Sequence, residues 1–276
     1  MTEADTIARA DSPATVDSLA ADLRALGLAP GMTILVHSSL SLLGWVCGGP
    51  VAVILALEEV LTPEGTLVMP SHSSDLSDPA RWQNPPVPES WWGPIRRTMP
   101  AFDPDLTPTR DMGRIAETFR KQPGVIRSGH PGDSFAAWGK HAAAITEGHS
   151  LEYGLGEGSP LARIYDLDGY VLLLGVGHGN NTSLHLAEYR ANFAGKKIVT
   201  NGAPIMTATP AGRAERQWAE YQDLDYDADD FWKVGEAFEK TGAARIGRVA
   251  CAECRLLPQR AIVDFAVKWL ERNRGK

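Results

Sequence analysis

The segment 170–189, YVLLLGVGHGNNTSLHLAEY, constrains the fold of this chain more than any other stretch. Its apolar run, 171–176, is short, partly β-branched and followed by glycines, a pattern typical of a buried strand that enters a tight loop. Asn180 and Asn181 are suitable helix N-caps, and residues 182–193 have helical character. The segment therefore predicts a strand, a glycine loop and a helix. Such a turn brings polar groups to the sheet edge where open α/β folds bind ligands.

His185 and Glu188 lie three residues apart on the predicted helix, so their side chains share one face and can interact. A carboxylate beside an imidazole fixes its tautomer and increases its basicity, as a general base requires. The same spacing is common in surface pairs on capped helices, so it does not identify an active site by itself. His178 in the loop adds a third metal-type ligand, but this spacing is not diagnostic of a metal site, and we expect none.

Two earlier strands also end in loops rich in histidine and serine. Residues 32–36 lead into HSSLS at 37–41, and residues 66–69 lead into PSHSSD at 70–75. A hydroxyl-rich turn after a buried strand can present amides and hydroxyls to phosphate or carbonyl oxygens, although it can also be a plain exit from the strand. Since three buried strands end in such loops, we expect the loops to meet at one edge of a sheet.

The remaining segments predict an ordinary alternation of helices, strands and loops. Residues 78–109 combine many prolines with three tryptophans, which predicts an ordered, irregular flap with a short helix near 93–99. Apolar spacing predicts helices over 14–28, 51–61, 112–121, 140–147, 160–166, 231–240 and around 262–270, and strands at 134–138 and within 244–257. Strands at 197–200 and 205–208 with Asn201-Gly202 between them indicate a hairpin.

Composition limits the classes of partner. The 276 residues carry a formal net charge of −7, which disfavours a nucleic-acid surface and would attract a polycationic small molecule. No apolar stretch is long enough to span a membrane, and the polar, acidic residues 1–13 do not resemble a signal peptide, so we expect a cytoplasmic protein with a flexible N-terminal arm. Three cysteines, Cys47, Cys251 and Cys254, argue against a disulfide framework and are interpreted as structural, with Cys47 buried.

Five motifs resemble the aminoglycoside 3-N-acetyltransferase family, which is distinct from the common GNAT acetyltransferase fold. They occur in the expected order and are HSSLSLLGWVCGGP, PSHSSD, TPTRDMGRIAETFR, RSGHPGDSFAAWG and GVGHGNNTSLHLAE. The resemblance extends from about residue 15 to the C-terminal helix. It implies an α/β fold in which helices sandwich a mixed central sheet, with a smaller α/β portion in the C-terminal half. We expect one domain over 14–276, with a substrate-side subregion at 195–257.

The resemblance also implies transfer of acetyl from acetyl-CoA to the 3-amino group of 2-deoxystreptamine antibiotics, and hence antibiotic resistance. It makes His185 the catalytic base and makes Glu188 the residue that orients it or meets the antibiotic. It places a coenzyme channel along two segments, with lining residues His37, Ser38, Ser39, Leu40, Ser41, Ser128, His130, Ser134 and Phe135.

The chemistry of the reaction adds expectations of its own. An amine that is protonated at neutral pH needs a base before it can attack a thioester, and donors at the strand–helix turn can stabilise the oxyanion; Asn181 and Thr182 are candidates. We expect direct transfer in a ternary complex. A cationic substrate needs carboxylates, and the candidates are Asp75, Glu188, Asp223, Asp225 and Asp229, although the run at 223–230 also fits a solvated loop. Acetylation of another amine, thioester hydrolysis and coenzyme binding without turnover are the alternatives. A monomer or a homodimer is expected.

Overall fold

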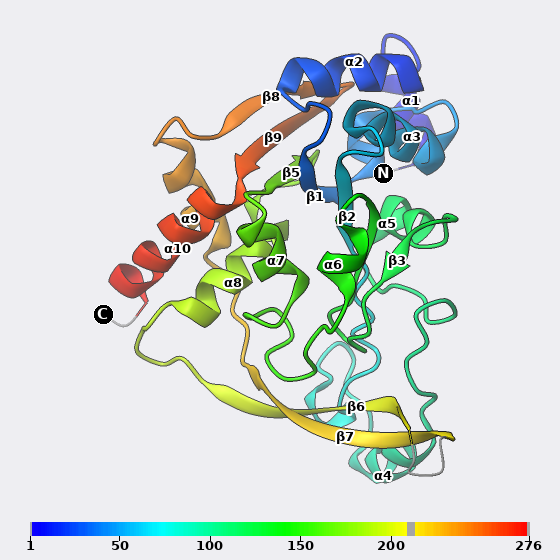
Figure 1. Cartoon of the computed structure of the whole chain (residues 1–276), viewed down its shortest axis with the longest axis vertical. Helices are drawn as coiled ribbons and strands as arrows, with labels where there is room; N and C mark the ends of the chain where they lie inside the picture. Colours follow the sequence, from blue (N-terminus) through cyan, green and yellow to red (C-terminus); the bar gives the residue numbers. More distant parts are fainter. Residues whose placement is uncertain (1, 209–212, 275–276) are drawn as a thin grey trace.

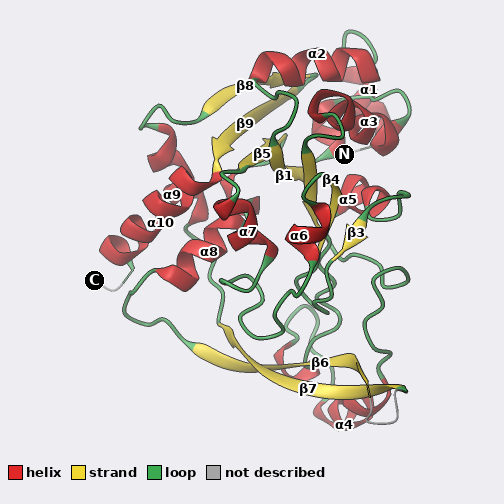
Figure 2. Cartoon of the chain, in the orientation of Figure 1, coloured by secondary structure: helices red, strands yellow, loops and turns green. Residues whose placement is uncertain are grey.

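A seven-stranded mixed sheet forms the centre of the computed structural model, which describes residues 2–208 and 213–274 (Figures 1 and 2). The strand order is β3-β4-β2-β1-β5-β9-β8. β1 lies between β2 and β5 and runs parallel to both, whereas the other pairs are antiparallel. The strands are β1 (Thr33–Ser38), β2 (Thr66–Pro70), β3 (Ile126–Arg127), β4 (Phe135–Gly139), β5 (Tyr170–Leu174), β8 (Arg245–Val249) and β9 (Ala252–Pro258).

Helices cover both faces of this sheet because the central strands are apolar on both sides. Along β1, Ile34 and Val36 enter one core cluster while Leu35 enters the other, as the two-residue period of a strand requires. One face carries α2 (Val16–Leu26), α3 (Gly49–Leu61) and α5 (Gly113–Phe119). The other carries α6 (Ala142–Thr146), α7 (Pro160–Asp166), α8 (Ser183–Arg190), α9 (Phe231–Glu239) and α10 (Gln259–Asn273). The predicted fold class, a mixed sheet between helices, is confirmed.

A long two-stranded hairpin lies apart from the main sheet (Figure 1). It pairs β6 (Ile198–Ala208) with β7 (Ala214–Leu224). The predicted turn at Asn201-Gly202 is wrong, because both residues are paired within β6, opposite Tyr221 and Glu220. Gly202 serves a different purpose: a Cβ there would lie 2.8 Å from the ring of Trp218, so the glycine admits the indole. The predicted subregion at 195–257 therefore divides, since β8 and β9 belong to the main sheet.

The flap at 78–109 packs on this hairpin. It contains the short 3₁₀ helix η2 (Pro79–Arg81) and α4 (Glu89–Thr98), which is the predicted short helix with an earlier start. Arg216 of β7 donates from Nε to the carbonyl of Met99 and from Nη2 to that of Arg96, both at 2.5 Å. The amide of Phe102 donates to the carbonyl of Pro204 at 3.1 Å. The hairpin and the flap thus form one unit beneath the sheet.

The N-terminal residues are helical, in contrast to the expected arm over 1–13. Thr2 and Asp5 form a reciprocal capping box for α1 (Glu3–Ala8), which contacts the 3₁₀ helix η1 (Leu40–Leu43). Trp45 Nε1 donates to Glu3 at 3.3 Å and Thr6 is buried, so tertiary contacts hold this segment. Among the helices of the described residues, none has the length and apolar character needed to cross a membrane.

Candidate active site

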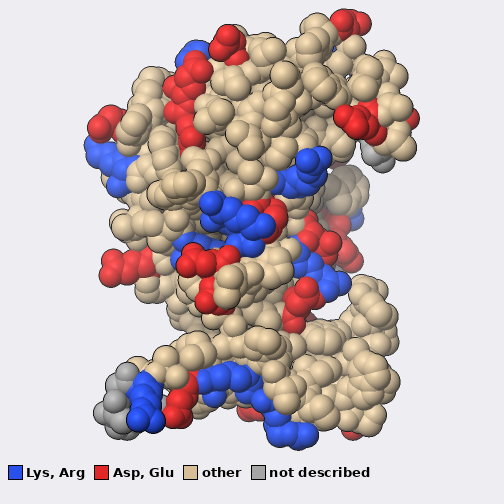
Figure 3. All heavy atoms as spheres, turned by 90° about the vertical axis from the view of Figure 1, so that its right-hand side faces the viewer, with Lys and Arg blue, Asp and Glu red and all other residues tan. Residues whose placement is uncertain are grey.

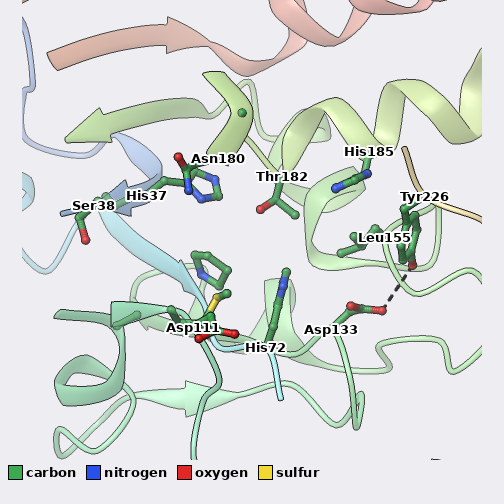
Figure 4. A pocket seen from close by; sticks show the side chains of 15 residues that line it. His37, Ser38, His72, Asp111, Asp133, Leu155, Asn180, Thr182, His185 and Tyr226 are labelled. Carbon is green, nitrogen blue, oxygen red and sulfur yellow. Dashed lines mark hydrogen bonds between the residues drawn. The ribbon is translucent and has the colours of Figure 1, made fainter. Parts of the chain in front are cut away.

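A cavity of ≈ 300 Å³ opens where the three parallel strands end (Figure 4). His37 and Ser38 line it from the end of β1, and His72 lines it from the loop after β2. Thr182 and His185 line it from the segment after β5. The expected meeting of the three loops is confirmed. In Figure 4, Thr182 and His185 face His72 and Asp133 across the opening.

His185 is held by Glu188 on one side and opens to the cavity on the other. Its Nδ1 lies 2.5 Å from Glu188 Oε2, and Glu188 is 1% exposed, so the pair is not the surface pair that the spacing also allowed. The rings of Tyr226 and Phe231 lie 5.0 and 4.8 Å from the imidazole centroid. The carboxylate accepts a hydrogen bond from Nδ1–H, so the proton of the neutral ring is on Nδ1 and the Nε2 lone pair is available toward the cavity. This is the tautomer that a general base requires.

The second oxygen of Glu188 is also engaged. Oε1 accepts from Arg274 Nη1 at 2.5 Å and from the amide of Asp227 at 3.3 Å. Because both oxygens have protein donors and the side chain is buried, Glu188 has the position of an orienting residue rather than of a substrate contact.

Two neutral histidines form a further part of the wall. Burial, with smaller contributions from His72 and His185, lowers the pKa of His37 to about 3. Burial likewise lowers the pKa of His72 to about 4. Within the described residues, the buried Nε2 atoms of both rings have no hydrogen-bond partner. An unpartnered buried nitrogen beside a cavity suits a ligand that supplies the missing hydrogen bond.

Asp133 brings negative charge to the cavity. Burial alone would raise its pKa, but the nearby His130 lowers the pKa overall, so the carboxylate is ionised at neutral pH. Its backbone amide donates to His130 Nδ1 at 2.8 Å, and the Tyr226 hydroxyl lies 3.4 Å from its Oδ2. Asp111 adds a second, exposed carboxylate that lines the cavity. A protonated amine fits such a wall.

Four of the residues predicted to line a coenzyme channel lie in the interior. Ser128, His130, Ser134 and Phe135 are each at most 1% exposed. Ser128 bonds His149 Nδ1 at 2.9 Å, and Ser134 donates to the carbonyl of Ser71 at 2.8 Å. These side chains fix the loop that carries Asp133, since polar side chains next to a strand can bond to the backbone instead of a ligand.

The other predicted coenzyme residues do reach open space. His37 and Ser38 line the main cavity, while Leu40 and Ser41 line a second cavity of ≈ 620 Å³. Ser39 lies between them, and its hydroxyl is 3.3 Å from that of Ser41. The second cavity also contains Gly48 and Gly49 at the start of α3, together with Arg114. The Gly49 amide donates to the carbonyl of Val46 at 3.0 Å, so the guanidinium of Arg114 is the suitable partner for phosphate here.

Most of the predicted acidic wall is occupied by contacts within the protein. Asp223 is buried and accepts from the hydroxyls of Tyr189 and Tyr226, and burial raises its pKa. Asp225 pairs with Arg81 at 2.9 Å, and Asp75 pairs with Arg110. Asp229 is exposed and is absent from the cavity lining. Figure 3 likewise shows acidic and basic side chains interspersed on the face that it presents.

The two oxyanion candidates differ in position. Thr182 lines the cavity, and within the described residues its hydroxyl has no protein partner. Asn181 is fully buried, and its Oδ1 accepts from the amide of Ser183 at 3.1 Å. The predicted N-cap at Asn180 or Asn181 is wrong, because the N-cap of α8 is the next residue, Thr182.

His178 and Cys47 also have positions of their own. His178 turns toward α9, where Nε2 lies 2.7 Å from Glu239, and it is absent from the cavity lining. Cys47, expected to be buried, is exposed because its loop lies at the surface before α3.

Sequence reasoning did not assign His72, Asp111, Asp133, Tyr226 or Arg274 to the site. His72 and Asp133 stand inside the motifs PSHSSD and RSGHPGDSF, so the motifs marked the correct loops but not the residues that face the cavity. Tyr226 lies within the acidic run. No local pattern marks Arg274, whose partner Glu188 is 86 residues away in the chain.

Comparison with known proteins gives consistent results. The family model described as aminoglycoside 3-N-acetyltransferase matches residues 35–271. The SPbeta prophage-derived aminoglycoside N(3')-acetyltransferase-like protein YokD of Bacillus subtilis (strain 168) is 52% identical over 265 residues, which is 96% of this chain and 95% of the relative. Aminoglycoside N(3)-acetyltransferase VII of Streptomyces paromomycinus is 37% identical over 292 residues, covering 100% of this chain and 98% of the relative.

Solved structures agree along almost the whole chain. The crystal structure of YokD superposes with a TM-score of 0.93, 50% identity and 98% coverage of both chains. AAC-IIIb, solved as a binary complex with CoASH, superposes with a TM-score of 0.84 and 38% identity. The match covers 96% of this chain and 99% of that chain. AAC-VIa bound to sisomicin superposes with a TM-score of 0.84 and 29% identity, covering 96% of this chain and 100% of that chain. Since the family match and both relatives span most of the sequence, the chain belongs to the aminoglycoside 3-N-acetyltransferase family.

Proposed function

We propose that the protein transfers an acetyl group from acetyl-CoA to an amino group of a cationic aminoglycoside, at the 3-position of its 2-deoxystreptamine ring. The observation that carries this proposal is the cavity in which the free Nε2 side of His185 faces ionised Asp133. A base and a carboxylate on opposite walls suit a substrate that arrives as an ammonium ion and must react as an amine. The CoASH complex of AAC-IIIb and the sisomicin complex of AAC-VIa support the two substrate classes by similarity.

The mechanism assigns one task to each wall. Asp133 binds the ammonium group. His185 Nε2 removes one proton from it, and the lone pair of the resulting amine attacks the thioester carbonyl. Negative charge develops on that carbonyl oxygen, and the Thr182 hydroxyl, which is free of protein partners in the described residues, is placed to donate to it. The C–S bond then breaks, and protonated His185 returns its proton to the departing thiolate. The amine's second proton leaves to solvent, so the reaction releases the amide, CoASH and one H⁺.

The coenzyme follows the loop at 37–41 in this proposal. The thioester lies in the main cavity near His37 and Ser38, and the chain continues past Leu40 and Ser41 to the second cavity. There, Arg114 meets the phosphates. Ser128, His130, Ser134 and Phe135 support this path from the interior instead of touching the coenzyme.

One observation favours a second acceptor class. Because Asp75, Asp223 and Asp225 are engaged within the protein, the cavity presents fewer free carboxylates than a polycation can use. A smaller amine with a single ammonium group would satisfy Asp133 equally well. Acetyl-CoA-dependent acetylation of such an amine is therefore the second candidate.

The test is release of CoASH from acetyl-CoA, read with a thiol reagent. The acceptors are a panel of 2-deoxystreptamine antibiotics, a panel of monoamines and an acceptor-free blank. Turnover with the antibiotics and a silent blank would support the proposal, turnover with monoamines alone would select the second candidate, and a signal in the blank would indicate hydrolysis. His185→Ala should retain the fold and lose about 10²–10⁴-fold in kcat. Turnover near the wild-type value in that variant would remove His185 as the base.

A further inference from the structure

We propose that Arg274, which follows α10 directly, is a positioning residue for the His185–Glu188 pair. This proposal rests on the function proposed above, in which His185 is the base. Arg274 reaches across to α8 and donates from Nη1 to Glu188 Oε1 at 2.5 Å. It lies outside the residues that the family match covers, which end at 271.

The Arg274 guanidinium is itself held rigidly. Nε and Nη2 donate to the two carboxylate oxygens of Asp230 at 2.8 and 2.5 Å, and Nη2 also donates to the carbonyl of Asp227 at 2.5 Å. Its carbon lies 5.3 Å from the ring centroid of Phe193, and the side chain is 11% exposed. A planar fork with this many fixed partners has one orientation, so it can define the position of a carboxylate.

The surrounding charges make Arg274 the cation that Glu188 depends on. The positive charge of Lys196 also interacts with Glu188 through space, but the hydrogen bonds of its ammonium group go to the carbonyls of Tyr189 and Ala191. Asp230 is paired with Arg274, and the histidines across the cavity, His37 and His72, are neutral. Burial alone would lower the pKa of the Arg274 guanidinium, but Asp230 and Glu188 raise it overall, so it is permanently charged.

The consequence reaches the reacting atoms through one intermediate residue. A buried carboxylate that loses its cation is driven toward its neutral form or toward a new rotamer. In either state, Glu188 no longer accepts a hydrogen bond from His185 Nδ1–H in a fixed geometry. The imidazole then samples the tautomer with a proton on Nε2, which cannot act as a base toward the cavity. Arg274 therefore affects catalysis by holding Glu188, without touching a substrate.

The kinetic test compares Arg274→Ala with Arg272→Ala, which removes an exposed arginine from the last turn of the same helix. We expect Arg274→Ala to lower kcat by about 10- to 100-fold with little change in either KM, and Arg272→Ala to match the wild type. In a Glu188→Ala background, Arg274→Ala should add no further loss. Guanidinium ion should restore part of the activity of Arg274→Ala. An unchanged kcat, or a loss that adds in full to that of Glu188→Ala, would overturn the proposal.

A spectroscopic test separates this inference from the proposed function. In protein labelled with ¹⁵N-histidine, and with His185 assigned from His185→Ala, the wild-type ring should show a protonated Nδ1 and an unprotonated Nε2. Arg274→Ala should show mixed tautomers, and Arg274→Lys, which keeps the charge without the fork, should fall between the two. If the wild type releases no CoASH with any acceptor, the proposed function fails, and the tautomer comparison still tests Arg274. A wild-type tautomer pattern in both variants would refute its positioning role.

Discussion

Mild acid should destabilise this protein, because three largely buried histidines remain neutral in the folded chain. Burial lowers the pKa of His37 to about 3 and that of His72 to about 4. Burial lowers the pKa of His149 to about 3. The unfolded chain binds these protons below about pH 6.5, and the folded chain does not. Stability is therefore complete above that pH and declines as pH falls toward the folded pKa values.

The magnitude follows from these pKa differences. Between pH 7.5 and 5, His37 contributes a loss of about 2 kcal/mol. His72 and His149 keep more solvent contact than His37, so we assign each of them half of the contribution of His37. The total loss of stability for the three histidines is then about 4 kcal/mol. Burial raises the pKa of Asp223 and Glu58, and these carboxyls offset part of the loss at the acid end. A loss of this size is a large fraction of the roughly 5–15 kcal/mol that stabilises a domain.

Urea unfolding followed by circular dichroism at pH 7.5, 6.5, 5.5 and 5 measures this loss. His149→Gln provides a matched variant. Its amide can donate to the carbonyl of Gly154 and accept from the Ser128 hydroxyl, as the imidazole does, but cannot titrate. The variant should lose about 1 kcal/mol less than the wild type over this range. A wild-type free energy of unfolding that changes by less than about 1 kcal/mol between pH 7.5 and 5 would refute the argument.

Three further predictions follow from single contacts. Gly235→Ala would place a Cβ 1.8 Å from the His178 ring, so it should destabilise the fold by about 2–4 kcal/mol in urea unfolding. In a His178→Ala background the same change should be neutral or stabilising by up to about 1 kcal/mol, and a persistent penalty there would show that the ring is not the cause. Asp133→Asn should raise the acceptor KM about tenfold or more and leave the acetyl-CoA KM unchanged. An acceptor KM equal to that of the wild type would exclude Asp133 as the ammonium contact. Asp225→Asn and Asp229→Asn should each leave the acceptor KM within about twofold, since one residue pairs with Arg81 and the other lies outside the cavity; a tenfold increase would return them to the substrate wall.

Local sequence patterns predicted the scaffold of the site well. The apolar runs before His37, His72 and His178 are short and end in loop-forming residues, so their strands and their common edge follow from period and turn chemistry alone. The spacing of His185 and Glu188 is likewise a property of one helix turn, and the structure has them bonded.

Contacts between distant residues account for what the sequence did not show. Asn201-Gly202 has the composition of a tight turn, but Trp218 on the partner strand takes the space that the glycine leaves, and pairing continues through it. In RSGHPGDSF, spacing cannot tell that His130 points inward while Asp133 faces the cavity, because that depends on His149 and Leu151 further along the chain. The acidic run at 223–230 has the sequence of a set of free charges. In the structure, three of its carboxylates are bound by Arg81, Tyr189 and Arg274, which are distant in sequence.

The hairpin of β6 and β7 connects the flap to the wall of the cavity. The end of β7 leads directly to Tyr226 in the cavity wall, while the rest of the hairpin bonds to the flap. His185 and the loops around it are anchored on the sheet and on α8, whose buried core would be damaged by most substitutions. We therefore expect substitutions at exposed positions of the hairpin and the flap to disturb the sheet less than substitutions in its core. The cavity is thus the place where the two parts meet, with Tyr226 after the hairpin lying 5.0 Å from the ring of His185 on α8.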